Sequence, residues 1–499
     1  MTNLDSFLER AAAEHPDRVA LRMDDLVLTY AQFRKAARQV STLLASAGVE
    51  PGDRVGIMLP NVPAFPIAFF GALAAGAITV PMNPLLKSRE VGYYLSDSGA
   101  SVLLAWHTAA AEAAKGAADA GAQVIPVETV DMADLLDGLA PAVGKSGRQD
   151  EDDAVILYTS GTTGTPKGAE LTHAGLVRNA ELTARTLLKN NPDDTTMGCL
   201  PLFHVFGLTC GLNATVAAAG TLTLLPRFDA AKALEIIKRD AVTIFEGVPT
   251  MYAAMLHLPE ADPAQTATLR VCVSGGASLP VEILRGFEEK FGCVILEGYG
   301  LSETSPVASF NHPDKVRKPG SIGTPIEGVE MRLVDDAGQN VAAGEIGEIA
   351  IRGHNVMKGY WGKPEATAEA ITDGWFRTGD MARVDEDGYY YIVDRKKDLI
   401  IRGGYNVYPR EIEEVLHEHP AVAEVAVIGM PHAELGEEVG AAVALKPGAT
   451  ATPEELRTFA RDKVAAYKYP RRVWLVDSLP KGPTGKILRR EVQPPEAGS

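Results

Sequence analysis

Short uninterrupted apolar runs recur along the first two-thirds of the chain, and segments with the apolar spacing of helices separate them. The runs lack the alternation of polar and apolar residues that marks a strand with one solvent-facing side. They are typical of strands buried on both faces in a sheet that helices cover. The runs are 101–105, 154–158, 243–245, 270–274 and 294–296. This part of the chain is therefore predicted to form layered α/β structure.

From about Val329 the pattern changes to alternating strands with turn signals between them. Residues 344–352 predict one such strand, and residues 389–393, which follow the turn 385–388, predict another. We expect a β-rich, barrel-like subdomain here.

A third pattern, mixed α and β, occupies the C-terminal part. It predicts a helix from Pro409, strands near 423–428 and 439–445, and a helix from Pro453 to about Tyr467. The predicted fold class is α/β with a β-rich subdomain, in which a small α+β C-terminal domain follows a large N-terminal one. The predicted domains are 1–394 and 395–499.

Residues 55–86 carry no charge and exceed the roughly 20 residues that span a bilayer. Five prolines divide this stretch into a strand at 55–59, a helix ending near Gly76 and a strand at 77–81, so no transmembrane segment is predicted. The amino terminus carries charge where a signal peptide has an apolar core. We expect a cytoplasmic protein.

The charge of the chain limits the partners that are expected, and its cysteine content limits the expected metal sites and disulfides. In the 499 residues, 48 Lys and Arg stand against 65 Asp and Glu, which gives a net charge of −17. No basic stripe offsets this charge, so nucleic acid is not an expected partner. The four cysteines are isolated, which argues against a zinc site or a disulfide framework and fits a reducing compartment.

The segment Tyr158-Thr-Ser-Gly-Thr-Thr-Gly-Thr-Pro-Lys-Gly168 holds the clearest chemical signal. It is predicted to lie between a strand ending at Tyr158 and a helix. Small residues, hydroxyl groups and one lysine after a strand can offer backbone N–H groups and a positive charge to a polyphosphate. The Gly-Lys-Ser/Thr order of a Walker A loop is absent, because Pro166 precedes Lys167 and Gly168 follows it. The segment predicts phosphate binding.

Five motifs in order carry a family resemblance over essentially the whole chain. They are residues 158–168, Gly298-Tyr-Gly-Leu-Ser-Glu-Thr304, Thr378-Gly-Asp380, Asp394-Arg-Lys-Lys-Asp-Leu399 and Pro480-Lys-Gly-Pro-Thr-Gly-Lys486. The chain resembles the AMP-forming acyl-CoA synthetases of the adenylate-forming superfamily, which includes firefly luciferases and peptide-synthetase adenylation domains. The resemblance implies ATP, Mg²⁺ and coenzyme A as ligands, and a C-terminal domain that turns between two half-reactions.

The resemblance also implies roles for single residues. Tyr299 would lie against adenine, Ser302 would meet the α-phosphate, and Asp380, with Arg395 beside it, would accept the ribose hydroxyls. Glu303 and the Thr159 hydroxyl would hold Mg²⁺. The residues that match nucleotide-binding positions are Thr159, Ser160, Gly161, Thr162, Thr163, Gly164, Lys167, Gly276, Ala277, Glu297, Gly298, Tyr299, Ser302, Asp380 and Arg395.

Residues near the C terminus match the moving parts of the family. Lys397 matches the hinge, and Gly403 and Gly404 match the backbone that lines the coenzyme A tunnel. Lys486 matches the catalytic lysine, because a cation delivered to the α-phosphate stabilises charge as a carboxylate attacks it. Lys481 is the weaker candidate.

The segment from Leu200 resembles the acyl pocket, with a Phe203–His204 pair. His204 is either catalytic or a buried core histidine, and the sequence leaves both open. No Asp follows the aromatic residue to hold a substrate ammonium, and Gly298 stands where malonate-activating relatives carry arginine. The expected pocket residues are Phe203, Val205, Phe206, Val248 and Leu301. We therefore expect a medium- or long-chain fatty acid, with an aryl acid such as cinnamate as the alternative.

Other functions share the adenylation step. An enzyme that loads a carrier protein would not depend on coenzyme A, a luciferase-like monooxygenase would emit light, and a non-catalytic sensor would bind ATP without releasing pyrophosphate. A homodimer, and acetylation of Lys486 as an off-switch, are further hypotheses.

Overall fold

The computed structural model describes residues 3–144, 146–159, 165–432 and 434–495. A seven-stranded sheet has the order β18-β8-β7-β4-β3-β5-β6, with parallel pairing from β7 to β6 and antiparallel pairing at the β18 edge. Its strands are β3 (Arg54–Met58), β4 (Ile78–Pro81), β5 (Ala100–Trp106), β6 (Gln123–Val127), β7 (Asp153–Thr159), β8 (Lys167–Thr172) and β18 (Gly359–Tyr360).

A nine-stranded sheet has the order β15-β14-β13-β12-β11-β9-β10-β1-β2 and is parallel between β13 and β1. Its strands are β1 (Val19–Met23), β2 (Leu26–Thr29), β9 (Thr195–Gly198), β10 (Thr221–Leu224), β11 (Ile244–Gly247), β12 (Val271–Ser274), β13 (Ile295–Gly300), β14 (Val307–Phe310) and β15 (Thr324–Pro325). The apolar runs found in the sequence are the parallel strands of these two sheets, as predicted.

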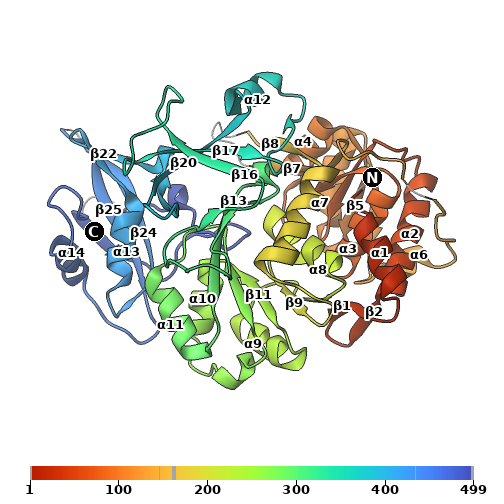
Figure 1. The fold of residues 1–499 in the computed structure, drawn as a ribbon, viewed down its shortest axis with the longest axis horizontal. Coiled ribbons are helices and arrows are strands. Elements are labelled where there is room, and N and C mark those ends of the chain that lie inside the picture. The colour runs from red at the N-terminus through yellow and green to blue at the C-terminus, as the bar shows by residue number, and fades with distance from the viewer. Residues whose placement is uncertain (1–2, 145, 160–164, 433, 496–499) are drawn as a thin grey trace.

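Helices cover both sheets, and one apolar core joins α2, α3 and α7 with strands of each sheet (Figure 1). Helix α3 is buried along its whole length, which explains its uniformly apolar sequence. The helices of the N-terminal part are α1 (Ser6–Glu14), α2 (Tyr30–Ser46), α3 (Ala64–Ala74), α4 (Ser88–Ser98), α5 (Ala110–Ala120), α6 (Ala133–Leu136), α7 (His173–Leu182), α8 (Ala214–Ala217), α9 (Ala230–Arg239), α10 (Pro249–Leu256), α11 (Val281–Phe291) and α12 (Pro364–Ala370). Residues 207–213 form a π-helical turn that leads into α8.

The β-rich part is a five-stranded antiparallel sheet. Its strands are β16 (Val329–Val334), β17 (Gly347–Gly353), β19 (Ile371–Thr372), β20 (Trp375–Val384) and β21 (Tyr390–Arg395).

The C-terminal sheet, also five-stranded, carries helices α13 (Pro409–His417) and α14 (Pro453–Arg461). Helix α14 ends six residues before the predicted end at Tyr467. A capping box of Thr452 and Glu455 fixes its start. The strands are β22 (Ile400–Arg402), β23 (Tyr405–Val407), β24 (Val422–His432), β25 (Gly436–Leu445) and β26 (Arg472–Leu475). The mixed α/β fold class is as predicted, and the domain boundary at 394/395, the last residues of β21, stays a prediction.

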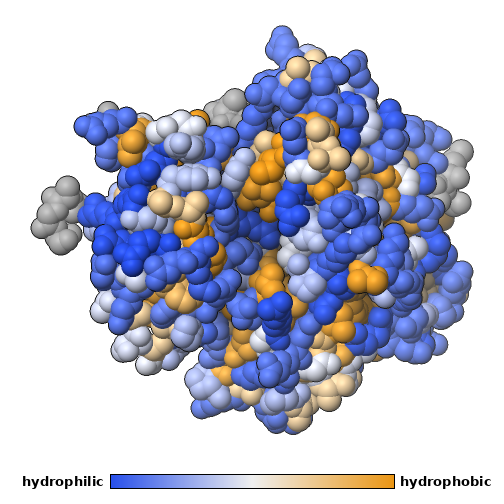
Figure 2. All heavy atoms as spheres, turned by 60° about the vertical axis from the view of Figure 1, so that its left-hand side comes forward, coloured by the Kyte–Doolittle hydropathy of each residue, from blue (hydrophilic) through white to orange (hydrophobic). Residues whose placement is uncertain are grey.

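The C-terminal elements lie beside α11, at the far end of the molecule from α1 and α2 (Figure 1). The amide of Val281, the first residue of α11, donates to a Glu414 carboxylate oxygen of α13 at 3.4 Å. Figure 2 shows that polar side chains cover most of the face on this side, with apolar residues in smaller areas between them. Among the residues that the structure describes, no helix combines the length and the apolar character that crossing a bilayer takes.

Candidate active site

The segment that is predicted to bind phosphate follows strand β7 and leads into the antiparallel strand β8. Strand β7 ends at Thr159, which pairs in register with Lys167, the first residue of β8. The expectation of a helix directly after the loop was wrong, because residues 167–172 form a strand before α7 begins at His173. Five expected nucleotide-binding residues lie outside the described residues: Ser160, Gly161, Thr162, Thr163 and Gly164.

The Glu303 carboxylate lies next to the start of this hairpin. The Thr159 hydroxyl donates to its Oε1 at 3.3 Å, and the Tyr360 hydroxyl donates to the same oxygen at 3.0 Å. Burial raises the pKa of Glu303, and these two hydrogen bonds partly oppose that rise. The Lys167 ammonium lies 5.1 Å from the centre of the Tyr360 ring. Tyr360 therefore contacts both the Lys167 ammonium and the Glu303 carboxylate.

This arrangement fits a magnesium ion. The Glu303 carboxylate and the Thr159 hydroxyl beside it both offer oxygen atoms as ligands. The described residues contain no cluster of three or more His, Cys, Asp or Glu side chains that could hold a metal. Mg²⁺ needs no such cluster, since it binds through one or two carboxylates together with substrate phosphates and water.

A second group of side chains comes from three strands. Asp380 of β20 pairs in register with Arg395 of β21, whose Nε lies 3.2 Å from Asp380 Oδ1. The Tyr299 hydroxyl of β13 donates to Asp380 Oδ2 at 2.6 Å. Burial and the nearby Asp380 charge raise the pKa of Tyr299, so the phenol stays protonated. Tyr299, Asp380 and Arg395 therefore form one connected group. The sequence analysis placed Arg395 beside Asp380 but did not predict the contact with Tyr299.

The backbone that carries Tyr299 is tightly enclosed. A Cβ added to Gly298 would lie 2.7 Å from the Phe310 ring, and one added to Gly300 would lie 1.8 Å from the Pro306 carbonyl oxygen. Only glycine fits at these two positions. The Glu297 carboxylate accepts from the backbone N–H groups of Leu279 and Gly320, at 3.3 and 3.1 Å, so it braces the strand end. Burial raises the pKa of Glu297 to about 7.

Lys486 reaches this group from the C-terminal part of the chain. The Thr250 hydroxyl, near the start of α10, donates to the Gly485 carbonyl at 2.9 Å. The Lys486 residue is half-buried. Desolvation, followed by the charge of Arg395, lowers its pKa to about 8, while Asp380 acts in the opposite direction. The structure thus brings a partly desolvated ammonium to the Tyr299–Asp380–Arg395 group.

The acyl segment also lies near Lys486. Burial, followed by the charge of Lys486, lowers the pKa of His204 to about 4, so its imidazole is neutral at physiological pH. Its Nδ1 accepts from the Phe206 amide at 3.3 Å. Val205 and Val248 are buried, and Phe203 and Leu301 are half-buried. A Cβ on Gly275 would lie 3.0 Å from the Phe206 ring, which places Phe206 against the Gly275–Ala277 turn.

Some predicted residues are not brought to this site. Lys397 is exposed in the short turn Lys396–Asp398, and Gly403 and Gly404 form the exposed hairpin turn between β22 and β23. Gly276 and Ala277, in contrast, lie in the turn against the acyl segment: a Cβ on Gly276, which has a positive φ, would lie 3.5 Å from Val248 Cγ1. Ser302 is half-buried and directly precedes Glu303. The hinge and coenzyme A roles remain predictions.

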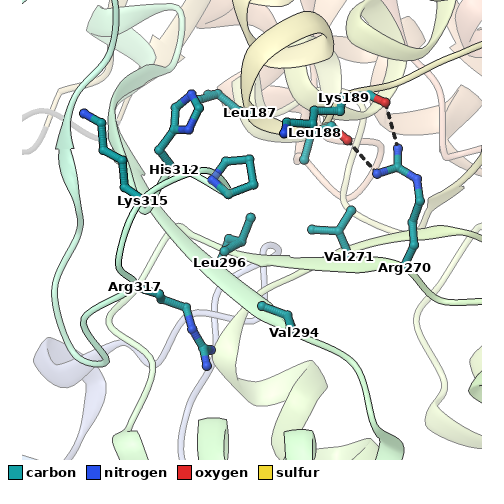
Figure 3. A pocket seen from close by; sticks show the side chains of 11 residues that line it. Leu187, Leu188, Lys189, Arg270, Val271, Val294, Leu296, His312, Lys315 and Arg317 are labelled. Atoms are coloured by element: carbon teal, nitrogen blue, oxygen red, sulfur yellow. Dashed lines mark hydrogen bonds between the residues drawn. The ribbon is translucent and has the colours of Figure 1, made fainter.

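A surface cavity of about 250 Å³ lies elsewhere (Figure 3). Val271, Val294 and Leu296 line it at the amino ends of β12 and β13, whereas the motif residues lie at the carboxyl ends. The Arg270 guanidinium at its edge is held by the carbonyls of Leu188 and Lys189. The cavity is therefore separate from the candidate active site.

The sequence reasoning missed two residues that position this site, Tyr360 and Thr250. Tyr360 lies in the two-residue strand β18, and Thr250 follows Pro249. Neither carries a local signal of its role, because each acts on a residue more than fifty positions away.

Comparison with known proteins identifies the family. The profile described as AMP-binding enzyme matches residues 8–361, and that of the AMP-binding enzyme C-terminal domain matches residues 411–486. The chain belongs to the family of AMP-binding enzymes. The resemblance to adenylate-forming acyl-CoA synthetases is thereby confirmed.

The relatives of this AMP-binding enzyme cover almost its whole length. It is 38% identical to a long-chain-fatty-acid–CoA ligase of Bacillus subtilis, over 98% of this chain and 94% of the relative. It is 39% identical to a feruloyl-CoA synthase of Amycolatopsis, over 98% of both chains. The crystal structure of an anthranilate CoA ligase with anthranoyl-AMP superposes with a TM-score of 0.93 at 32% identity, over 98% and 96% of the two chains. The predicted class, an AMP-forming acid–thiol ligase, agrees with all three.

Proposed function

We propose that this AMP-binding enzyme joins a fatty acid of medium or long chain to coenzyme A through an acyl-AMP intermediate. The observation that carries the proposal is the half-buried Lys486 ammonium, whose pKa responds to Arg395 and Asp380 and which lowers the pKa of the neutral His204. The identity with long-chain-fatty-acid–CoA ligases supports the choice of acid.

In the first half-reaction, a carboxylate oxygen of the acid attacks the α-phosphorus of ATP and pyrophosphate leaves. Asp380 accepts the ribose hydroxyls, and Lys486 stabilises the negative charge that develops at the α-phosphate. Glu303 and Thr159 would hold Mg²⁺, which neutralises charge on the phosphates. His204 stays neutral and lines the acyl side of the reacting carboxylate.

In the second half-reaction, the C-terminal domain turns about Lys397, and Gly403 and Gly404 line the path of coenzyme A. The thiol gives up its proton and attacks the acyl carbon, and AMP leaves as the thioester forms. The exposed position of both glycines in the present arrangement supports a turn between the two steps.

The test is pyrophosphate release with acetate, octanoate, palmitate, cinnamate, malonate and amino acids, each with and without coenzyme A. Sustained turnover that needs coenzyme A and a fatty acid is expected. Turnover with cinnamate instead would favour the aryl-acid alternative, which the sequence identity with a feruloyl-CoA synthase supports. Release that stalls at acyl-AMP would favour loading of a carrier protein.

Three finer points belong to the proposal. The four cysteines are free and buried, which fits a cytoplasmic location. Acetylation of Lys486 would remove its charge, and unchanged adenylation by fully acetylated enzyme would contradict that role. The proposed homodimer would be tested by measuring the molar mass in solution by light scattering.

A further inference from the structure

Glu246 is a carboxyl group in the protein interior that the proposed reaction does not use. It lies in β11, its exposed fraction is 1%, and neither of its carboxyl oxygens has a hydrogen-bond partner among the described residues. Leaving such a group unpaired is destabilising, so buried polar groups without partners are rare and call for an explanation.

The position of Glu246 is next to the acyl segment. Two residues further along the same chain, Val248 packs against the Lys486 loop: a Cβ on Gly485 would lie 3.1 Å from Val248 Cγ2. Glu246 therefore lies two residues before a side chain that contacts the Lys486 loop.

The continuation of the acyl segment also lies next to Glu246. After Phe206 the chain forms the π-helical turn Gly207–Asn213, and π-helical turns often occur at functional sites. A Cβ on Gly211 of this turn would lie 3.4 Å from Glu246 Oε2. The side chains of Thr209 and Asn213 on the same turn also contain polar atoms without partners.

We propose that the Glu246 carboxyl group binds an oxygen atom on the acyl part of the substrate, and that the enzyme therefore selects acids carrying a hydroxyl or carbonyl group remote from the carboxylate. This inference rests on the proposed function, because it names the acid class of the same site.

The chemistry of the group suits this role. Burial raises the pKa of Glu246 to about 8, so the carboxyl is protonated at neutral pH. A neutral carboxylic acid in an apolar site donates one hydrogen bond and accepts others. A substrate hydroxyl or carbonyl would complete these bonds, whereas a plain alkyl chain would leave them unmade. Sites that hydrogen-bond a substrate oxygen reject analogues lacking it far more strongly than apolar pockets reject an extra methylene.

The test compares acids that differ only in one oxygen: octanoate with 8-hydroxyoctanoate and with 7-oxooctanoate, and cinnamate with 4-hydroxycinnamate. The readout is kcat/KM for coenzyme A-dependent pyrophosphate release. The wild type is expected to favour the oxygenated member of at least one pair by about tenfold or more. Glu246→Leu should remove this preference, and Glu246→Gln, which keeps both a donor and an acceptor, should retain most of it.

Val273→Ala is the matched control. Val273 is in register with Glu246 on the neighbouring strand and thus on the same face of the sheet, but carries no polar group. It should leave the oxygen preference in place. Glu246→Met takes the place of the leucine variant if that one does not fold.

Equal kcat/KM values within every pair for the wild type would overturn the inference, as would an unchanged preference in the apolar variants. If no acid gives turnover dependent on coenzyme A, the proposed function fails and this inference with it. Turnover without discrimination removes this inference alone.

Discussion

Replacing Lys486 by alanine tests the central electrostatic claim. The fall of the Lys486 pKa from 10.5 to about 8 corresponds to about 3 kcal/mol of lost stabilisation of the ammonium, at 1.36 kcal/mol per unit. An anionic group at the α-phosphate position would restore that stabilisation. We expect Lys486→Ala to lower the rate of acyl-AMP formation by about 10²- to 10³-fold, as removal of one preorganised donor does in other enzymes.

The assay separates the two half-reactions. Adenylation is followed by pyrophosphate release in single turnovers, and thioester formation is followed by coenzyme A consumption from supplied acyl-AMP. The first should fall in Lys486→Ala and the second should largely survive. Equal losses in both would refute the assignment of Lys486 to adenylation.

Lys481 offers a matched control in the same loop. Its ammonium pairs with Glu424 at 2.6 Å, so it is engaged outside the site. Lys481→Ala should keep both rates within about threefold of the wild type, since a partly exposed ion pair contributes about 1 kcal/mol or less. A loss as large as that of Lys486→Ala would show that any cation in this loop serves.

Two further predictions follow from buried bases. Because the Lys486 pKa is about 8 in the folded enzyme, its ammonium is present below that pH and lost above it, so kcat/KM for adenylation should fall as pH rises through about 8; a flat profile to about pH 9.5 would contradict this. His173 is buried and accepts from the Leu4 amide, and burial lowers its pKa from 6.5 to about 4. The unfolded chain therefore binds a proton that the folded chain does not, and the free energy of unfolding, measured by urea titration, should fall by up to about 3 kcal/mol between pH 6.5 and 4. A His173→Gln variant should lose most of this dependence, and an unchanged slope in that variant would rule out His173 as its source.

Local patterns predicted β3, β4, β5, β7, β11, β12 and β13 of the two large sheets because each is a short apolar run. The other strands of these sheets were not predicted. Local patterns failed at residues 167–172, whose length and mixed polarity give no clear period, while the helical spacing from Leu176 onward is strong. The end of α14 was also missed, because nothing in the sequence between Arg461 and Tyr467 breaks a helix, and tertiary packing decides where it stops.

The candidate site divides in the same way. Motif residues such as Asp380 and Lys486 were predicted because they stand in short segments with a fixed order. The hydrogen bond between Tyr299 and Asp380, and the one between Tyr360 and Glu303, join segments that are 57 to 81 residues apart. Pairings of that kind depend on how strands are ordered in a sheet, which no single segment encodes. Glu246 could not be predicted as a site residue for another reason. Only its burial in the folded protein distinguishes it from other glutamates.

The contact between Gly298 and Phe310 restricts how this enzyme could change its acid in evolution. Any side chain at position 298 would meet the Phe310 ring, which is itself buried in the core. An arginine there would require the Phe310 ring to shift or position 310 to become smaller. A smaller residue at position 310, taken alone, would leave a hole in the core and bring no new substrate in return.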